Sequence, residues 1–182
     1  MIEHITMRTT LAIAALLLAA SAGTAAADDD LALMATGAWM MPRGNVGESY
    51  GGGAEARMAD DHMTLGFGAR ALVGRAPAER RRDVMDVDFN VGLLLCECES
   101  ISPYVGIGLD ILHITTHEPT RSVRGSTLGL SGHAGLMGKL GDDDDGWIWR
   151  ASAQYLGAIV PGTGEDLGGI TLSIAVGKQI MD

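Results

Sequence analysis

Few residues of this sequence have the type and spacing that catalysis requires, and the most suggestive are Ser131 and His133. Serine and histidine act as nucleophile and general base in many hydrolases. Side chains two residues apart along a strand are separated by about 7 Å, whereas a nucleophile and its base need a distance of about 2.6–3.2 Å. The sequence therefore predicts no catalytic residue, and we interpret His133 as a hydrogen-bonded interior group.

Metal ligands are the second possibility, because His113, His117 and Glu118 lie close together in the sequence. Four residues of an extended strand span about 13 Å, so these side chains would meet around a metal only if the chain folded back on itself. The acidic run Asp142–Asp145 offers oxygen ligands for a cation, although such a run more commonly forms a solvated turn. We expect neither a metal nor a cofactor.

The elements that position these residues show a period of two. In the segment GWIWRASAQYLGAIVP, residues 146–161, Arg150, Ser152 and Gln154 alternate with apolar and small residues. This alternation predicts a strand with one apolar and one polar face. It recurs over residues 31–41, 48–59, 62–74, 84–96, 101–114, 126–140 and 168–180. These segments are near or above the roughly 9–11 residues with which a tilted strand crosses a bilayer.

The composition limits where such strands can fold. The chain has 182 residues, 47% of them hydrophobic, with 26 glycines and a formal net charge of −10, and its mean hydropathy is +0.18. Arg8, the apolar run 11–20 and Ala25–Ala27 predict a signal peptide over residues 1–27, which leaves 28–182 as one domain. Because that domain has no run of about 18 apolar residues, a closed barrel is the structure that satisfies its backbone inside lipid.

The sequence therefore predicts an all-β fold, a closed eight-stranded antiparallel up-and-down transmembrane barrel. Longer connections at 42–47, 75–83, 115–125 and 161–167 alternate with shorter ones, as is typical of bacterial outer-membrane barrels. The inward positions hold balanced charges, and pairing makes buried charge tolerable. The expected lumen network consists of Glu55, Arg57, Arg70, Asp86, Asp88, Asp110, Lys139 and Arg150. The expected interface aromatics are Trp39 and Tyr50 at the outer surface and Trp147 and Trp149 at the periplasmic surface.

Residues 102–108 read SPYVGIG, which is similar to the PYVGxG phrase in strands of the small eight-stranded outer-membrane barrels of Gram-negative bacteria, the OmpA, OmpX and OmpW-like group. The strand pattern of residues 28–182 resembles that of the same group. The resemblance implies an outer-membrane location, with membrane lipid and the barrel insertion machinery as partners. Members of the group usually end on an aromatic residue that this machinery recognises, whereas this sequence ends Gln179-Ile180-Met181-Asp182.

Arginines gather in the segment RAPAERRRD, residues 75–83, which we interpret as an outer loop. Guanidinium groups bind phosphate well, and lipopolysaccharide presents phosphates at that level of an outer membrane. One hypothesis is that lipopolysaccharide contacts Arg75, Arg80, Arg81 and Arg82. The alternative is a soluble loop with no ligand.

The function expected from this fold is that of a non-enzymatic envelope protein whose lumen is filled by side chains, with a structural or surface-interaction role. A narrow channel for small or hydrophobic molecules is one alternative. Another is a soluble periplasmic barrel of lipocalin type, whose apolar faces would point inward around a ligand. We expect no nucleic-acid partner. The sequence leaves open the oligomeric state and the redox state of Cys96 and Cys98.

Overall fold

The computed structural model describes residues 30–43, 47–60, 62–76, 80–96, 101–141, 146–158 and 168–181. The expected signal peptide, the acidic run Asp142–Asp145 and Cys98 lie outside these ranges, whereas Cys96 is described and is disulfide-bonded. The strands are β1 (Asp30–Pro42), β2 (Ser49–Ala59), β3 (Met63–Ala76), β4 (Arg80–Leu94), β5 (Ile101–His117), β6 (Ser122–Leu140), β7 (Trp147–Gly157) and β8 (Gly169–Met181). The described ranges contain no helix with the length and hydrophobicity needed to span a bilayer.

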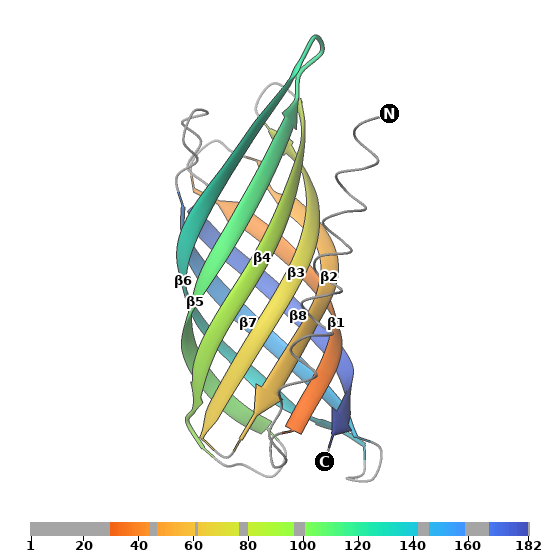
Figure 1. Ribbon diagram of the computed structural model, residues 1–182, viewed down its shortest axis with the longest axis vertical. Helices are drawn as coiled ribbons and strands as arrows, with labels where there is room; N and C mark the ends of the chain where they lie inside the picture. The colour runs from red at the N-terminus through yellow and green to blue at the C-terminus, as the bar shows by residue number, and fades with distance from the viewer. Residues whose placement is uncertain are drawn as a thin grey trace.

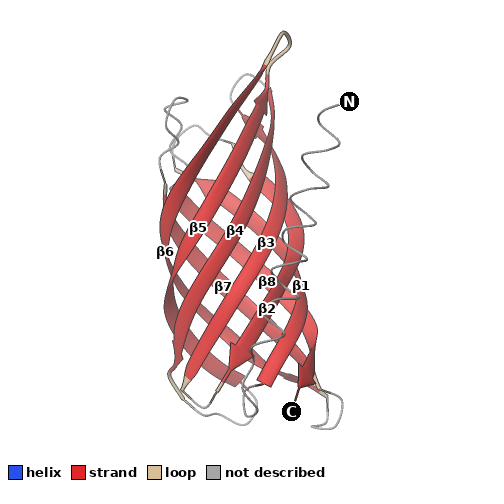
Figure 2. Cartoon of the chain, viewed as in Figure 1, coloured by secondary structure: helices blue, strands red, loops and turns tan. Residues whose placement is uncertain are grey.

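The strands form a closed antiparallel barrel, as the sequence predicts. Each strand pairs with the next along the chain, and β1 closes the barrel by pairing with β8 (Figure 1). Strands make up the whole wall (Figure 2). We call the end where β1 begins and β8 ends the terminal end, and the opposite end the distal end. The closed ring leaves no free edge along the paired length of the wall, which removes the main aggregation hazard of a β-sheet.

The strands on one side extend further than their sequence pattern indicates. The segment 75–83 was expected to be a loop, but β3 continues to Ala76 and β4 begins at Arg80, with Arg75 opposite Arg81. The expected loop 115–125 likewise contains the ends of β5 and β6, which pair up to His117 and Ser122. The prediction of long distal loops was therefore wrong at these two connections. Polar side chains on both faces hid the strands, because period-two alternation is visible only where one face is apolar.

The extended strand ends form a ribbon that rises above the rest of the distal end (Figure 1). We call this ribbon the distal finger, and it comprises residues 73–76, 80–83, 113–117 and 122–126. With 17 and 19 residues, β5 and β6 exceed the roughly 9–11 residues of a bilayer crossing. The finger is therefore the part of the wall that would stand outside a membrane.

The apolar faces of the strands point away from the barrel axis. Phe89, Leu109 and Ile174 are 49%, 53% and 65% exposed. The side chains of Arg70, Asp88 and Arg150 point into the barrel, and these residues are only 7%, 7% and 6% exposed. This orientation is the one predicted for a lipid-facing wall. It is opposite to the lipocalin-type arrangement, in which the apolar faces would surround the axis.

The interior is layered, and it is not polar throughout. At its distal side, inward apolar residues form a cluster that we call the distal plug: Ala38, Met40, Leu72, Val84, Leu112, Ile114, Leu156 and Ala158. A smaller apolar cluster of Ala32, Met34 and Ala175, with Ile148 packed against it, lies toward the terminal end. The charged residues lie on the terminal side of the distal plug. Three of them, Arg57, Glu55 and Arg150, are cross-strand partners of Ala32, Met34 and Ala175, so the smaller cluster lies beside the charges.

Candidate functional site

Arg70 of β3 is the centre of one half of the lumen network. Its guanidinium contacts carboxylate oxygens of Asp86 at 2.5 Å, Asp88 at 3.3 Å and Asp110 at 3.9 Å. It also donates a hydrogen bond of 3.1 Å to Gln154, which in turn donates one of 2.6 Å to Asp110. Asp88 and Asp110 are direct cross-strand partners, and like charges in that position repel each other. Arg70 therefore supplies the cation that allows three carboxylates to share one buried space.

Glu55 of β2 is the centre of the other half. Its carboxylate accepts a hydrogen bond of 2.8 Å from Arg57 and a second from Arg150. Arg150 donates to the Tyr104 hydroxyl at 3.1 Å, and the Arg57 guanidinium lies 5.3 Å from the centroid of the same ring. A cation over an aromatic face is attracted by the ring quadrupole. Two guanidiniums are thus held by one carboxylate and one aromatic ring.

Asn90 of β4 joins the two halves into one network. Its side-chain oxygen accepts a hydrogen bond of 3.0 Å from Arg57, and its side-chain nitrogen donates one of 2.8 Å to Asp88. Arg57 also donates to Thr64 at 2.9 Å. The contacts cross the lumen, because their members come from β2 to β7. Connected hydrogen bonds of this kind strengthen one another in a low-dielectric interior and hold the opposite walls in one arrangement.

Two inward glycines make room for these side chains. A Cβ added at Gly68 would lie 2.4 Å from an oxygen of Asp88, and one at Gly66 would lie 2.5 Å from the side-chain oxygen of Asn90. Each glycine is the cross-strand partner of the residue that it accommodates. A narrow barrel can therefore hold large polar side chains on one strand because glycines on the neighbouring strand leave space for them.

Lys139 and Arg82 are placed differently from the expectation. Lys139 has the inward register of β6 but lies exposed near the terminal end, so its place in the network stays a prediction. Arg82 was expected in a loop, yet it is fully buried on the inward face of β4, where it donates to the Gly47 carbonyl and, at 3.2 Å, to Ser49. In the described part of the chain, the connected network holds the carboxylates Glu55, Asp86, Asp88 and Asp110 and the guanidiniums Arg57, Arg70 and Arg150.

The other expected loop arginines separate onto two faces of the distal finger. Arg80 points inward and pairs with Glu118 at 2.7 Å. Arg75 and Arg81 lie on the outward face and are exposed, and Arg81 pairs with Asp83 at 2.9 Å. Because successive strand residues point to opposite sides, the run Arg80–Arg82 cannot present three guanidiniums to one ligand.

The expected interface aromatics lie at opposite ends of the barrel. Trp39 and Tyr50 are cross-strand partners near the distal end, and Trp39 donates to Glu48 at 3.1 Å. Trp147 and Trp149 lie at the start of β7, near the terminal end. The structure adds Tyr155 to the distal group: Arg43 lies 4.8 Å from the centroid of its ring. The amphipathic rings of tryptophan and tyrosine suit the level at which apolar wall meets polar surroundings.

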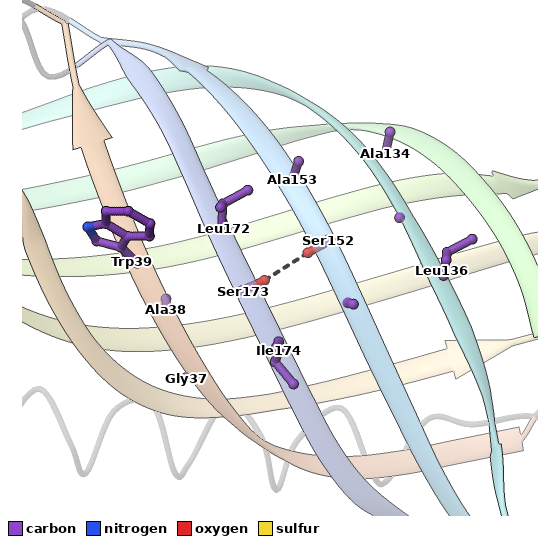
Figure 3. Close-up of a pocket in the computed structure, with 12 residues that line it drawn as sticks. Gly37, Ala38, Trp39, Ala134, Leu136, Ser152, Ala153, Leu172, Ser173 and Ile174 are labelled. Carbon is purple, nitrogen blue, oxygen red and sulfur yellow. Dashed lines mark hydrogen bonds between the residues drawn. The ribbon is translucent and has the colours of Figure 1, made fainter.

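The outward wall has an open hollow of about 680 Å³ over β1, β6, β7 and β8. Small residues such as Ala134 and Ala153 form its floor, and Trp39, Leu136 and Leu172 stand around it (Figure 3). The hydroxyls of Ser152 and Ser173, which hydrogen-bond at 2.7 Å, belong to the inward faces of the same strands. The hollow is thus a depression in the apolar outer face.

Ser131 and His133, whose spacing along the strand was judged too long for a nucleophile and its base, have different surroundings in the structure. Ser131 donates a hydrogen bond of 2.5 Å to Asp110. The Nε2 atom of His133 is buried and has no hydrogen-bond partner among the described residues. His133 nevertheless hydrogen-bonds to the backbone of Ile107, which agrees with its interpretation as a hydrogen-bonded interior group. Ser131 belongs to the lumen network.

A different serine and histidine meet on the outward face of the distal finger. The Ser122 hydroxyl lies 3.2 Å from His117 Nδ1, and His117 Nε2 lies 3.0 Å from an Asp83 oxygen. His117 is thereby hydrogen-bonded to two neighbours, and its neighbour Glu118 contacts Arg80 and Arg121. Sequence analysis missed this trio because its members come from β4, β5 and β6. The signal that could have found it is the register of the hairpin, which places Ser122 opposite His117.

The turn between β2 and β3 is held by Asp60. Its Oδ1 accepts hydrogen bonds from the backbone N–H groups of His62 (2.8 Å) and Met63 (2.6 Å). These two bonds favour the carboxylate and hold the pKa of Asp60 below its usual range. An aspartate that bonds the backbone two or three residues ahead is a common turn former.

We expect the contribution of Asp60 to stability to depend on pH. Since its folded-state pKa is lowered, the contribution is present above the pKa of the unfolded chain, about 4, and is lost as the pH falls through the lower folded-state value. Asp60→Ala should therefore unfold at a lower urea concentration than the native sequence at pH 7, and the difference should shrink below about pH 4. Urea titrations at several pH values measure this. A difference that grows on acidification would contradict it.

Comparison with known proteins supports the architecture. No family model and no curated protein sequence matches the chain. Among solved structures, neisserial surface protein A is similar with a TM-score of 0.64 and 11% identity. The N-terminal barrel domain of Pseudomonas aeruginosa OprF has a TM-score of 0.54 and 16% identity. Ail of Yersinia pestis, solved with the heparin analogue sucrose octasulfate, has a TM-score of 0.55 and 13% identity. Each alignment covers 84% of this chain and 97% of the other. By its strand number, closure and pairing, the chain has the fold of the small eight-stranded outer-membrane barrels.

Proposed function

We propose that this protein is a non-enzymatic integral barrel of a Gram-negative outer membrane, with a lumen filled by side chains and a structural or surface-interaction role. The observation that carries the proposal is the inversion of polarity across the wall. Leu109 and Ile174 face outward and are more than half exposed, whereas Arg70 and Arg150 are buried inside. An apolar exterior around a polar interior is unfavourable in water and favourable in lipid.

The dimensions agree with a membrane environment. The shortest strands, β2 and β7, have 11 residues, enough for a tilted crossing. Distal and terminal aromatic residues border the apolar wall, and the solved structures with the same fold are outer-membrane barrels. Export through a signal peptide over residues 1–27 and folding by the barrel insertion machinery complete the proposal.

Membrane fractionation tests the location. After alkaline extraction, we expect the protein to remain with the outer-membrane fraction and to migrate differently in gels before and after heating, as closed barrels resist detergent until heated. Release into buffer without detergent would instead support a soluble periplasmic barrel. A protein that sediments with the inner membrane would contradict the outer-membrane assignment.

The interior favours a closed barrel over a narrow channel. Leu72, Val84 and Leu112 of the distal plug are each at most 1% exposed, and the ion network fills the space beneath them. Interiors packed in this way have few voids larger than a water molecule. We therefore expect the purified protein to give no stable conductance steps in planar bilayers. Reproducible conductance steps that disappear when a lumen residue is replaced would show that the protein is a channel and would contradict the proposal.

The surface-interaction role is assigned to the distal finger. This ribbon rises above the wall (Figure 1) and carries charged residues on both faces. If the wall lies in an outer membrane, the base of the finger is at the level of lipopolysaccharide phosphates. We accordingly propose lipopolysaccharide as a partner. The complex of Ail with a sulfated sugar analogue shows that one barrel of this fold binds a polyanion, which is consistent with this role.

A second candidate function, surface ester hydrolysis, rests on the trio of Ser122, His117 and Asp83. Its distances of 3.2 and 3.0 Å approach those of a nucleophile, base and orienting acid. Ser122 is exposed on an open strand face, whereas efficient acyl transfer also needs preorganised oxyanion donors away from water. We therefore expect no covalent labelling by a fluorophosphonate probe. Labelling that is lost in Ser122→Ala and in His117→Ala would favour the enzyme.

A further inference from the structure

We propose that the outward face of the distal finger is a binding surface for the phosphate groups of outer-leaflet lipid, formed by Arg75, Arg81 and Arg124. The inference rests on the proposed membrane location and names the residues that make the contact. The hypothesis from the sequence named Arg75, Arg80, Arg81 and Arg82. The structure places Arg80 and Arg82 on the inward face, and Arg124 of β6 joins Arg75 and Arg81 on the outward face. The following contacts support it.

The strand register brings these arginines onto one face. Arg75 of β3 is the direct partner of Arg81 of β4, and Arg81 is in turn opposite His117 of β5. Arg124 of β6 is opposite Thr115, two residues from His117. Strands are spaced by about 4.8 Å, so Arg81 and Arg124 stand on the order of 10–12 Å apart along the wall. This spacing suits a ligand with more than one phosphate, or two neighbouring headgroups.

The face has an excess of positive charge. Among the described residues of its four strand segments, Asp83 is the acidic residue that faces outward beside the three arginines. Arg75, Arg81 and Arg124 are all exposed, and Asp83 contacts Arg81 and His117. Two guanidiniums placed directly opposite each other, as Arg75 and Arg81 are, repel, and Asp83 provides only one negative charge against the three arginines. A bound phosphate removes that repulsion and accepts charge-assisted hydrogen bonds from both.

On each contributing strand the apolar wall begins within two outward positions of the arginine. Moving toward the terminal end along the outward face, Arg75 is followed by Val73 on β3, and Arg124 is followed by Ser126 and Leu128 on β6. Val73 is 40% and Leu128 71% exposed. An anionic group held at the arginines would therefore have hydrocarbon-binding surface directly beneath it. This combination selects a phosphorylated amphiphile over a free phosphate ion.

Arg121 is the control, because the other two arginines at this end, Arg80 and Arg82, lie on the inward face. Arg82 is buried within the barrel, and Arg80 is on the inward face with Glu118. Arg121 lies at the tip of the β5–β6 hairpin, where it pairs with Glu118 at 2.8 Å and has a side chain that is 73% exposed. Replacing Arg121 removes one exposed charge from the tip of this hairpin without altering the outward face of the distal finger.

The test uses the full mature barrel folded in detergent and titrated with purified lipopolysaccharide, with the thermal unfolding midpoint as the readout. We expect lipopolysaccharide to raise this midpoint for the native sequence and for Arg121→Ser. The combined Arg75→Ser, Arg81→Ser and Arg124→Ser variant should need at least about tenfold more lipopolysaccharide for the same rise. Dephosphorylated lipopolysaccharide should have a smaller effect on the native protein, and the difference should diminish at high salt.

Three outcomes overturn the proposal. The triple variant responds like the native protein, or Arg121→Ser loses the response equally, or inorganic pyrophosphate at equal phosphate concentration reproduces the full effect. The last result would identify a free-phosphate site. The unliganded midpoint and heat-modifiable migration of the triple variant report separately on the barrel. If the unliganded midpoint and the migration of the triple variant match those of the native protein while lipopolysaccharide binding is lost, the barrel is intact. The loss of binding then identifies the three arginines as the phosphate surface.

Discussion

Arg70→Met should destabilise the barrel by about 3–5 kcal/mol, or prevent it from folding, because removing one partner from a buried ion network leaves uncompensated charge. Arg70 is the guanidinium within 4 Å of Asp86, Asp88 and Asp110. Without it, these three carboxylates remain buried and lose that cation. Methionine keeps much of the side-chain volume, so the effect measures lost charge more than lost packing. Urea unfolding of the detergent-folded protein gives the free-energy difference.

Two further variants make that result specific to the network. Arg81→Met removes a guanidinium from a solvent-exposed pair with Asp83 and should change the free energy of unfolding by no more than about 1 kcal/mol. Adding Asp86→Asn to Arg70→Met should restore part of the lost stability, since contacting residues are energetically coupled. An Arg70→Met variant as stable as the native protein would show that the buried charges are neutralised without Arg70.

Leu109→Arg should cost about 2–4 kcal/mol, the range for a basic residue at the middle of a lipid-facing strand. Leu109 lies on the outward face of β5, between Phe89 of β4 and Leu130 of β6. In a soluble barrel the same substitution would place a charge on an exposed surface and change stability by no more than about 0.5 kcal/mol. Folding titrations in lipid vesicles distinguish these two environments.

Ser126→Arg is the matched control for that experiment. Ser126 is exposed on the outward face of β6, two residues beyond Leu128, and hydrogen-bonds to His113 at 2.8 Å. An arginine there would lie at the base of the distal finger, and near the interface a basic residue costs only about 0–1 kcal/mol. Equal losses for Leu109→Arg and Ser126→Arg would contradict a membrane boundary between these positions.

The interior combines two means of closing a narrow barrel. Apolar packing at the distal plug excludes water, and the ion network ties strands on opposite walls by directional contacts such as Arg150 to Glu55. Replacing a whole buried ion network by apolar residues is often neutral in stability. The network is therefore better understood as fixing one interior arrangement than as the main source of stability, which comes from the closed wall and its apolar contacts.

Local alternation was enough to predict the closed all-β barrel, the inward direction of Arg70, Asp86 and Asp110, and the outward direction of Phe89 and Leu109. The reason is that successive side chains of a strand point to opposite faces. Once the apolar residues identify the outward face, the residues between them must point inward. The prediction failed where neither face is apolar. The ends of β4 and β5 in the distal finger have no amphipathic pattern, and their pairing depends on backbone bonds to a neighbouring strand.

What tertiary structure decided is which inward residues meet across the lumen. Val84 and Leu112 occupy the same inward register as the charges, but their position along the axis places them in the plug. Lys139 and Arg82 are on inward faces, yet one lies exposed at the terminal end and the other beyond the plug. The sequence determines the face on which each side chain lies. Its neighbours across the barrel depend on strand stagger and tilt, which are properties of the closed sheet as a whole.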